Sequence, residues 1–145
     1  MNRPWLIALV TIVPALLPLV WGWHLMRRAR HSVDWPEAPA TIRESRVVQQ
    51  GNARSPRLSF DYVAAAQPRV GDRLWVGPRS IAVTGHWADR VAARYPVGAA
   101  VRVAVDPRNP AYAVLEPGLR LVHWLPFLVG AAVLAGGVIT LAVGG

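Results

Sequence analysis

Cysteine is absent from the sequence, and this absence excludes disulfide bonds, thiol catalysis and thiolate metal sites. Lysine is also absent, so all 16 basic residues are arginines. Arginine without lysine, beside many alanines, glycines and prolines, is typical of a GC-rich bacterial genome. Acidic residues are few, at 8, which leaves a net charge of +8. The charges are spread through the middle of the chain, a pattern typical of a solvated surface.

Charge of either sign is missing from two long apolar stretches, residues 4–26 and 124–143. At about 1.5 Å per helical residue, the first reaches roughly 35 Å, enough to cross a hydrocarbon core of about 30 Å. We predict a transmembrane helix over each stretch. A cleaved signal peptide is the alternative for the first stretch, but its apolar core would be only about 7–15 residues long. The observed length and the arginines that follow favour an uncleaved anchor.

Tryptophan and arginine stand at the ends of these stretches, where both residue types favour the membrane–water interface. Arginines follow the first stretch and precede the second, and positive charge is retained on the cytoplasmic side. We therefore predict a multi-pass protein of the inner membrane, with the middle segment in the cytoplasm and both termini outside. The predicted interface residues are Trp5, Trp21, Trp23, Arg27, Arg28, Arg30 and Trp124.

Small residues recur every seven positions in both apolar stretches. Such a stripe lets helix backbones approach closely, which is how helices associate where lipid supplies no hydrophobic drive. The pattern is consistent with an antiparallel hairpin of the two helices, and equally with a homodimer. The predicted helix-packing residues are Ala8, Ala15, Gly22, Gly130 and Gly137.

The segment between the helices divides into a juxtamembrane linker, residues 27–37, and a small β-rich soluble domain, residues 38–118. Alternating apolar and polar residues predict strands, and Gly, Pro and Asn clusters predict turns. The expected fold is a small antiparallel β sandwich or open barrel with one short helix, flanked by the two transmembrane helices. The predicted strands are 40–48, 57–63, 74–76, 80–84, 101–105 and 111–115, the helix is 88–95, and the turns include 51–52 and 67–72.

The side chains expected to point into the domain core are the apolar members of these alternating patterns. In the strand 57–63, for example, Leu58, Phe60 and Tyr62 share one face and Arg57, Ser59 and Asp61 the other. The full set of inward candidates is Ile42, Leu58, Phe60, Tyr62, Trp75, Ile81, Val101, Val103 and Leu115.

One run of residues resembles the closing signature of a known membrane family. It comprises Tyr-Pro-Val-Gly at 95–98, Asp-Pro-Arg-Asn-Pro at 106–110 and Ala-Val-Leu-Glu-Pro-Gly at 113–118. The family is catalogued as domain of unknown function 3592. The resemblance covers about residues 35–118 and implies a membrane helix, a β-rich segment and a final helix. The family has no established activity, so the resemblance implies none.

The signature is explained by backbone geometry. A proline ends the short helix, a glycine permits a sharp entry into the next strand, and two Asx-Pro pairs form a rigid turn. We interpret its residues as structural: Tyr95, Pro96, Gly98, Asp106, Pro107 and Pro110.

Motifs that would indicate catalysis or ligand binding are missing. The four histidines form no spaced pair of the kind that binds zinc. Ser80, His86 and Asp89 could be combined into a hydrolytic triad, but no nucleophile elbow surrounds the serine. We therefore expect no metal, no cofactor, no nucleic-acid partner and no identifiable small-molecule substrate. Uncharged spans also argue against a transporter.

The leading hypothesis is a non-enzymatic bacterial inner-membrane protein that presents its β-rich domain for protein–protein interaction. Its partners would be the lipid bilayer and either another protein or further copies of the chain, contacted through an exposed sheet edge or the arginine-bearing strand faces. Two alternatives stay open: a membrane immunity protein that neutralises a toxin, and a membrane-bound hydrolase.

Overall fold

The computed structural model describes residues 4–143, except for the side chains of a few residues near the two ends of the chain. The described residues belong to two compact units. The helical unit contains the chain up to Arg28 and from Leu119 onward, and the β unit contains Ala29–Gly118.

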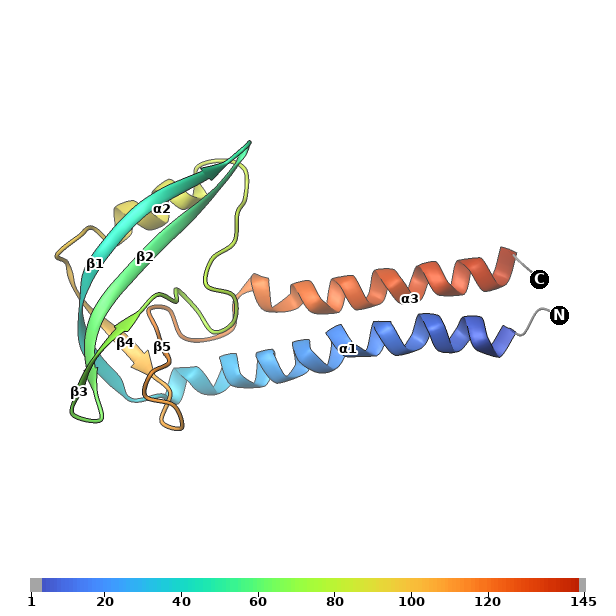
Figure 1. Cartoon of the computed structure of the whole chain (residues 1–145), viewed down its shortest axis with the longest axis horizontal. Helices are drawn as coiled ribbons and strands as arrows, with labels where there is room; N and C mark the ends of the chain where they lie inside the picture. The colour runs from blue at the N-terminus through green and yellow to red at the C-terminus, as the bar shows by residue number, and fades with distance from the viewer. Residues whose placement is uncertain (1–3, 144–145) are drawn as a thin grey trace. The chain divides into compact units, whose positions relative to one another are not determined.

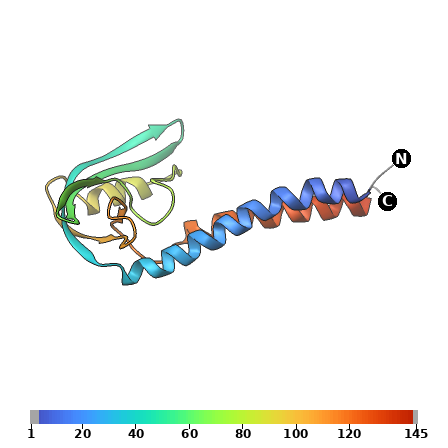
Figure 2. The ribbon, with the colours of Figure 1, turned by 60° about the horizontal axis from the view of Figure 1, so that its bottom comes forward.

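The helical unit consists of two long helices that run side by side (Figures 1 and 2). Helix α1 spans Pro4–His31, its last turn belonging to the β unit, and α3 spans Leu125–Val143 after a short 3₁₀ helix, η2, at Leu121–Trp124. Within the described residues, the stretch Leu121–Ile139 is long and apolar enough to cross a membrane. The corresponding span at residues 4–26 stays a prediction.

The β unit contains one antiparallel sheet of five strands in the order β3-β2-β1-β4-β5 (Figure 1). The described residues form a single sheet, so the two packed layers of a sandwich are not seen. The strands are β1 (Glu37–Gln50), β2 (Ala53–Ala64), β3 (Gln67–Gly71), β4 (Ala100–Val105) and β5 (Ala113–Val114), and the helical elements are η1 (Ser32–Asp34) and α2 (Trp87–Arg94).

The two edges of this sheet are connected beyond the strands themselves. Arg73, just after β3, forms a parallel bridge with Val114 of β5. The Leu115 amide donates to the Arg73 carbonyl at 3.1 Å, and the Glu116 amide donates to the Leu74 carbonyl at 2.6 Å. The segments that follow the two edge strands therefore pair with each other, while the sheet itself stays open, with β3 and β5 at its edges.

The long β1–β2 hairpin carries most of the pattern seen in the sequence. Its register runs from Ala40 opposite Tyr62 to Gln50 opposite Ala53, around a turn at Gly51. A register shift between Ile42 and Glu44 marks a β-bulge, which kinks the strand. The predicted inward residues of β2, Leu58, Phe60 and Tyr62, are all buried.

The predicted turn at 67–72 is wrong, because residues 67–71 form strand β3. The chain reverses instead at Ala65 and Ala66, which both adopt positive φ, at 52° and 58°. Pro68 suggested a turn, but an edge strand tolerates a proline because one side of its backbone needs no ladder partner. Gly71 also has a packing role, since a Cβ there would overlap the Phe60 ring.

The predicted strands 74–76 and 80–84 are likewise wrong. The chain between β3 and α2 is irregular, and within 80–84 only Val83 pairs with a strand neighbour, exchanging backbone hydrogen bonds of 2.9 and 3.0 Å with Arg54. Three consecutive residues, Leu74, Trp75 and Val76, are all buried. A strand alternates its side chains between two faces, so this run is better suited to a loop that fills the core.

The core lies between the inner face of the sheet, this loop and α2. Helix α2 packs on β1 and β2, burying Ala88 and Val91, and the rings of Trp75 and Trp87 lie 5.6 Å apart. Ile81 and Val101, expected inside, are only half-buried. The buried apolar residues of the β unit that were not among the predicted inward candidates are Ala29, Trp35, Ala40, Leu74, Val76, Ala88, Val91, Ala104, Val105, Ala113 and Val114.

Much of the segment expected to act as a linker is ordered against the rest of the β unit. Ser32 is fully buried, and its hydroxyl donates to the Ala29 carbonyl at 2.6 Å. The same hydroxyl accepts the Gly118 amide at 2.8 Å. One side chain therefore joins the first and last residues of the β unit.

Candidate functional site

Small residues line the inside of the helical hairpin. Ala15 is fully buried, and Gly22, Gly130 and Gly137 are buried as well. The side chain of Ala8 lies outside the described residues. A Cβ on Gly22 would sit 2.9 Å from the Cβ of Pro126, too close for a real contact. At Gly22, a member of the predicted stripe, the two helices therefore approach each other closely.

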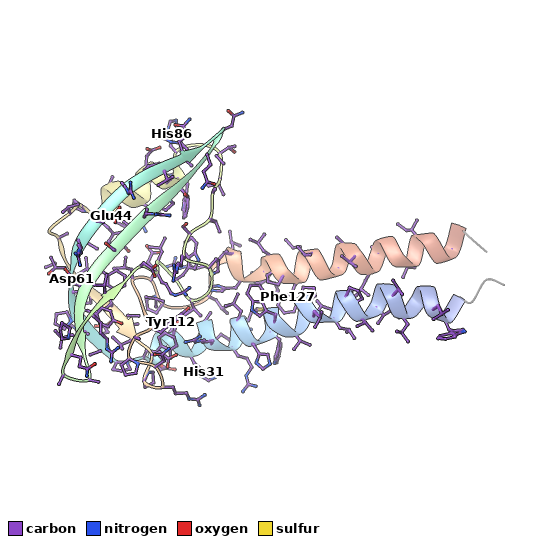
Figure 3. All side chains as sticks on the ribbon, viewed as in Figure 1. His31, Glu44, Asp61, His86, Tyr112 and Phe127 are labelled. Carbon is purple, nitrogen blue, oxygen red and sulfur yellow. The ribbon has the colours of Figure 1, made fainter. Side chains whose placement is uncertain are left out.

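Phe127, labelled in Figure 3, also approaches Gly22, because its ring would be 3.1 Å from a Cβ on that glycine. Four residues after Pro126, a Cβ on Gly130 would be 2.8 Å from the Leu19 side chain. These contacts pair the end of α1 with the start of α3. The two helices are therefore antiparallel neighbours, which corresponds to the hairpin alternative.

Large apolar side chains cover the outside of the hairpin. Val10 and Leu17 on α1 are 67% and 70% exposed, and Leu128 and Val138 on α3 are both 65% exposed. Removing such a side chain from water is worth about 1.5–3 kcal/mol. Over the residues that the structure describes, the outside of both helices is therefore largely apolar.

The predicted interface residues are also on the outer surface. Trp5, Trp21, Trp23 and Trp124 are each more than half exposed, and Arg27, Arg28 and Arg30 are exposed at the end of α1. Because Gly22 faces Pro126, the tryptophans at 21, 23 and 124 lie at one end of the hairpin and Trp5 lies toward the other. Exposed tryptophans therefore lie toward both ends of the hairpin.

The signature residues hold the backbone together after α2. The Tyr95 amide donates to the Val91 carbonyl at 3.2 Å as the helix ends, and Gly98, at φ 83°, donates to the Ile42 carbonyl at 2.8 Å. Pro96 contributes its carbonyl, which accepts the Ala99 amide at 3.1 Å. Tyr95 Oη donates to Glu116 at 2.9 Å. Burial, with this hydrogen bond, raises the pKa of Tyr95 to about 12.

The turn at 106–110 is held by its own side chains. Asp106 is buried, and its carboxylate accepts the Arg108 amide at 2.9 Å. The Tyr62 hydroxyl donates to the Pro110 carbonyl at 2.8 Å, and burial raises the pKa of Tyr62. Pro107 is exposed at the second position of the turn. All six signature residues therefore lie in scaffolding turns and contacts.

A cleft of about 500 Å³ opens on the β unit, and sequence reasoning did not identify it. Its charges come from three arginines and two carboxylates. Arg43 lies 3.6 Å from Asp61, and Arg79 lies 3.2 Å from Asp72. Glu44 and Asp61 are labelled on the sheet in Figure 3. The cleft is lined by Arg43, Glu44, Pro56, Arg57, Leu58, Ser59, Val70, Asp72, Arg79 and Ser80.

Two arginines face each other across the β1–β2 hairpin beside this cleft. Arg46 is the register partner of Arg57, and both are exposed. Like charges directly opposite in a sheet repel. Arg46 is compensated by Glu44 at 2.5 Å, whereas within the described residues no carboxylate lies in ion-pair range of Arg57. The alternation of β2 predicted that Arg57 lies on the face opposite the core residues. Its pairing with Arg46 could not be predicted, because it depends on the bulge in β1.

The residues of the proposed hydrolytic triad are not assembled. The Asp89 carboxylate forms an ion pair with Arg54 and lies 3.6 Å from His86 Nδ1. In the part of the chain that the structure describes, no hydrogen bond joins Ser80 to either residue. The same part contains no cluster of three histidine or carboxylate side chains able to hold a metal ion.

Comparison with known proteins adds one result. The model of the family described as a domain of unknown function, DUF3592, matches residues 38–120, more than half of the chain. The chain belongs to the DUF3592 family. The DUF3592 match begins in β1 and ends just after the β unit, so it includes every strand of the sheet. Neither a curated protein nor a solved structure matches this DUF3592 chain.

Proposed function

We propose that this DUF3592 protein is a membrane-anchored, non-enzymatic interaction protein of the bacterial inner membrane. Both long helices cross the bilayer as a hairpin, and the β unit contacts a protein partner or a second copy of the chain in the cytoplasm.

The observation that carries the membrane part is the distribution of side chains in the hairpin. Small residues lie between the two helices, and large apolar residues lie on the exposed surface of both. A water-soluble helix pair requires the reverse, with apolar side chains buried between the helices. The exposed tryptophans at both ends and the arginines after residue 26 support the same environment.

The interaction role is supported by the outer face of the sheet. It carries the opposed pair Arg46 and Arg57 as well as exposed Val63 and Val70. Arginine is enriched at protein–protein interfaces, and exposed apolar side chains beside it can be buried by a partner.

Cysteine labelling in intact cells tests the topology, because the chain has no cysteine of its own. A membrane-impermeant maleimide should label Asn2→Cys from outside, whereas Asn52→Cys, at the exposed tip of the β1–β2 hairpin, should react only after lysis. Labelling of both before lysis would refute the two-span topology, and the opposite pattern would refute the orientation. Release of the full-length chain by a salt wash without detergent would refute membrane insertion.

Site-specific photocrosslinking tests the interaction role. A photoreactive residue at Val63, on the outer face, should give a discrete adduct in cells, and the same residue at Arg108, exposed in the 106–110 turn, serves as the control position. Differently tagged copies of the chain then separate a homo-oligomer from a second protein. Equal adduct patterns at both positions, or none at Val63, would refute the outer-face interaction.

A further inference from the structure

The arginine-lined cleft has the composition of an oxyanion site. Of the residues that line it, the polar groups able to donate hydrogen bonds are the guanidinium groups of Arg43, Arg57 and Arg79 and the hydroxyls of Ser59 and Ser80. Its volume of about 500 Å³ is within the roughly 300–1,000 Å³ typical of small-ligand pockets. We propose that this cleft binds a phosphate-bearing ligand, an activity beyond the partner binding proposed above, with Arg57 and Val70 belonging to both surfaces.

The carboxylates near the cleft already have partners. Glu44 is 2.5 Å from Arg46, Asp72 is 3.2 Å from Arg79, and Asp61 is 3.6 Å from Arg43. Arg43 and Arg79 each have a carboxylate partner, whereas Arg57 has none among the residues that the structure describes. An anion in the cleft would therefore bind first to the guanidinium of Arg57.

The register of the hairpin supports the same ligand class. Arg46 opposes Arg57 directly, and like charges in this arrangement repel. Glu44 offsets the charge of Arg46, and an anion beside Arg57 would reduce the remaining repulsion. A guanidinium group offers a planar fork of donors that matches phosphate oxygens. A phosphate monoester carries about −1.5 to −2 charges and three oxygens, so it can engage Arg57 together with a second arginine and a serine hydroxyl.

The phosphate could belong to a lipid headgroup or to a soluble phosphate ester, and the same chemistry recognises both. The full-length chain in a phosphate-free maltoside detergent allows the two sources to be compared by calorimetric titration. The probes are inorganic phosphate, glycerol 3-phosphate and the short-chain lipid dihexanoyl phosphatidic acid, each at ionic strength matched with chloride.

Two variants show whether binding depends on Arg57 in particular. Arg57→Gln removes the guanidinium that the ligand would engage. Arg102→Gln removes an exposed arginine of the same sheet that pairs with Glu37 at 2.8 Å and does not line the cleft. Thermal unfolding of both variants checks that they fold.

We expect saturable binding of at least one phosphate probe, weakened about tenfold or more by Arg57→Gln and less than about twofold by Arg102→Gln. Tighter binding of the lipid than of glycerol 3-phosphate, lost in Arg57→Gln, would assign the ligand to the bilayer, and equal binding would assign it to a soluble ester. The proposal is overturned if no probe saturates below about 20 mM, if chloride competes as well as phosphate, or if both variants lose affinity equally. None of these outcomes depends on protein partner binding.

Discussion

Replacing Gly22 by alanine should weaken the helical hairpin, and Gly136→Ala provides a matched control. Both substitutions add one methyl group inside a helix, so both gain the same helix propensity of up to about 1 kcal/mol. At Gly22 the new Cβ meets the Pro126 ring carbon at 2.9 Å, whereas at Gly136 no atom lies within 4 Å. Because the proline ring cannot rotate away, the helices must separate or shift. Overpacking of this kind costs about 1–3 kcal/mol, which is therefore the expected difference in unfolding free energy between the two variants.

The free-energy difference can be measured by unfolding the full-length protein in mixed micelles with increasing sodium dodecyl sulfate, followed by tryptophan fluorescence. Gly22→Ala should unfold at a lower fraction of the denaturing detergent than the wild type, and Gly136→Ala at an equal or higher fraction. If the two variants unfold together, the two helices do not approach each other at Gly22, and the packing described above is incorrect.

Three further predictions concern the β unit. Ala66→Gly should stabilise it by up to about 1 kcal/mol, because Ala66 has a φ of 58° that glycine adopts without strain; an unchanged or lower melting temperature would contradict this. Tyr95 should ionise near pH 12 in ultraviolet difference titrations, well above the ordinary value of 10.0. Since its folded-state pKa is raised, its contribution to stability is complete below about pH 10 and disappears as the pH rises to about 12, a loss that Tyr95→Phe should not show. Asp106→Ala should cost about 1–3 kcal/mol by leaving the Arg108 amide without its acceptor, whereas Asp106→Asn, which keeps an oxygen there, should cost less in the same thermal unfolding assay.

Sequence periodicity predicted the hairpin strands, α2 and β4 because each has an unbroken local signal. The chain around Leu58, Phe60 and Tyr62 alternates strictly, and all three side chains are buried as expected. The predictions failed where tertiary contacts decide the conformation. Strand β3 contains a proline and a glycine, which locally indicate a turn, but pairing with β2 keeps it extended.

The hairpin stripe and the interface tryptophans could be proposed from spacing alone, because a helix has a fixed period. The cleft could not, since it combines residues from β1, β2, β3 and the loop after it. The pairing of Arg57, which lines the cleft, with Arg46 beside it depends on the bulge that shifts the register after Ile42. A one-residue bulge cannot be recognised from the sequence here, because the strand pattern continues on both sides of it.

The hydrogen bonds of Ser32 have a consequence for how this family could diversify. Because one hydroxyl bridges the Ala29 carbonyl and the Gly118 amide, the entry and exit of the β unit are neighbours. A module whose ends meet can be exchanged as a cassette, with little demand on the sequences it is spliced between. Recombination could therefore replace the β unit between the two helices, or insert this β unit into a surface loop of an unrelated soluble protein.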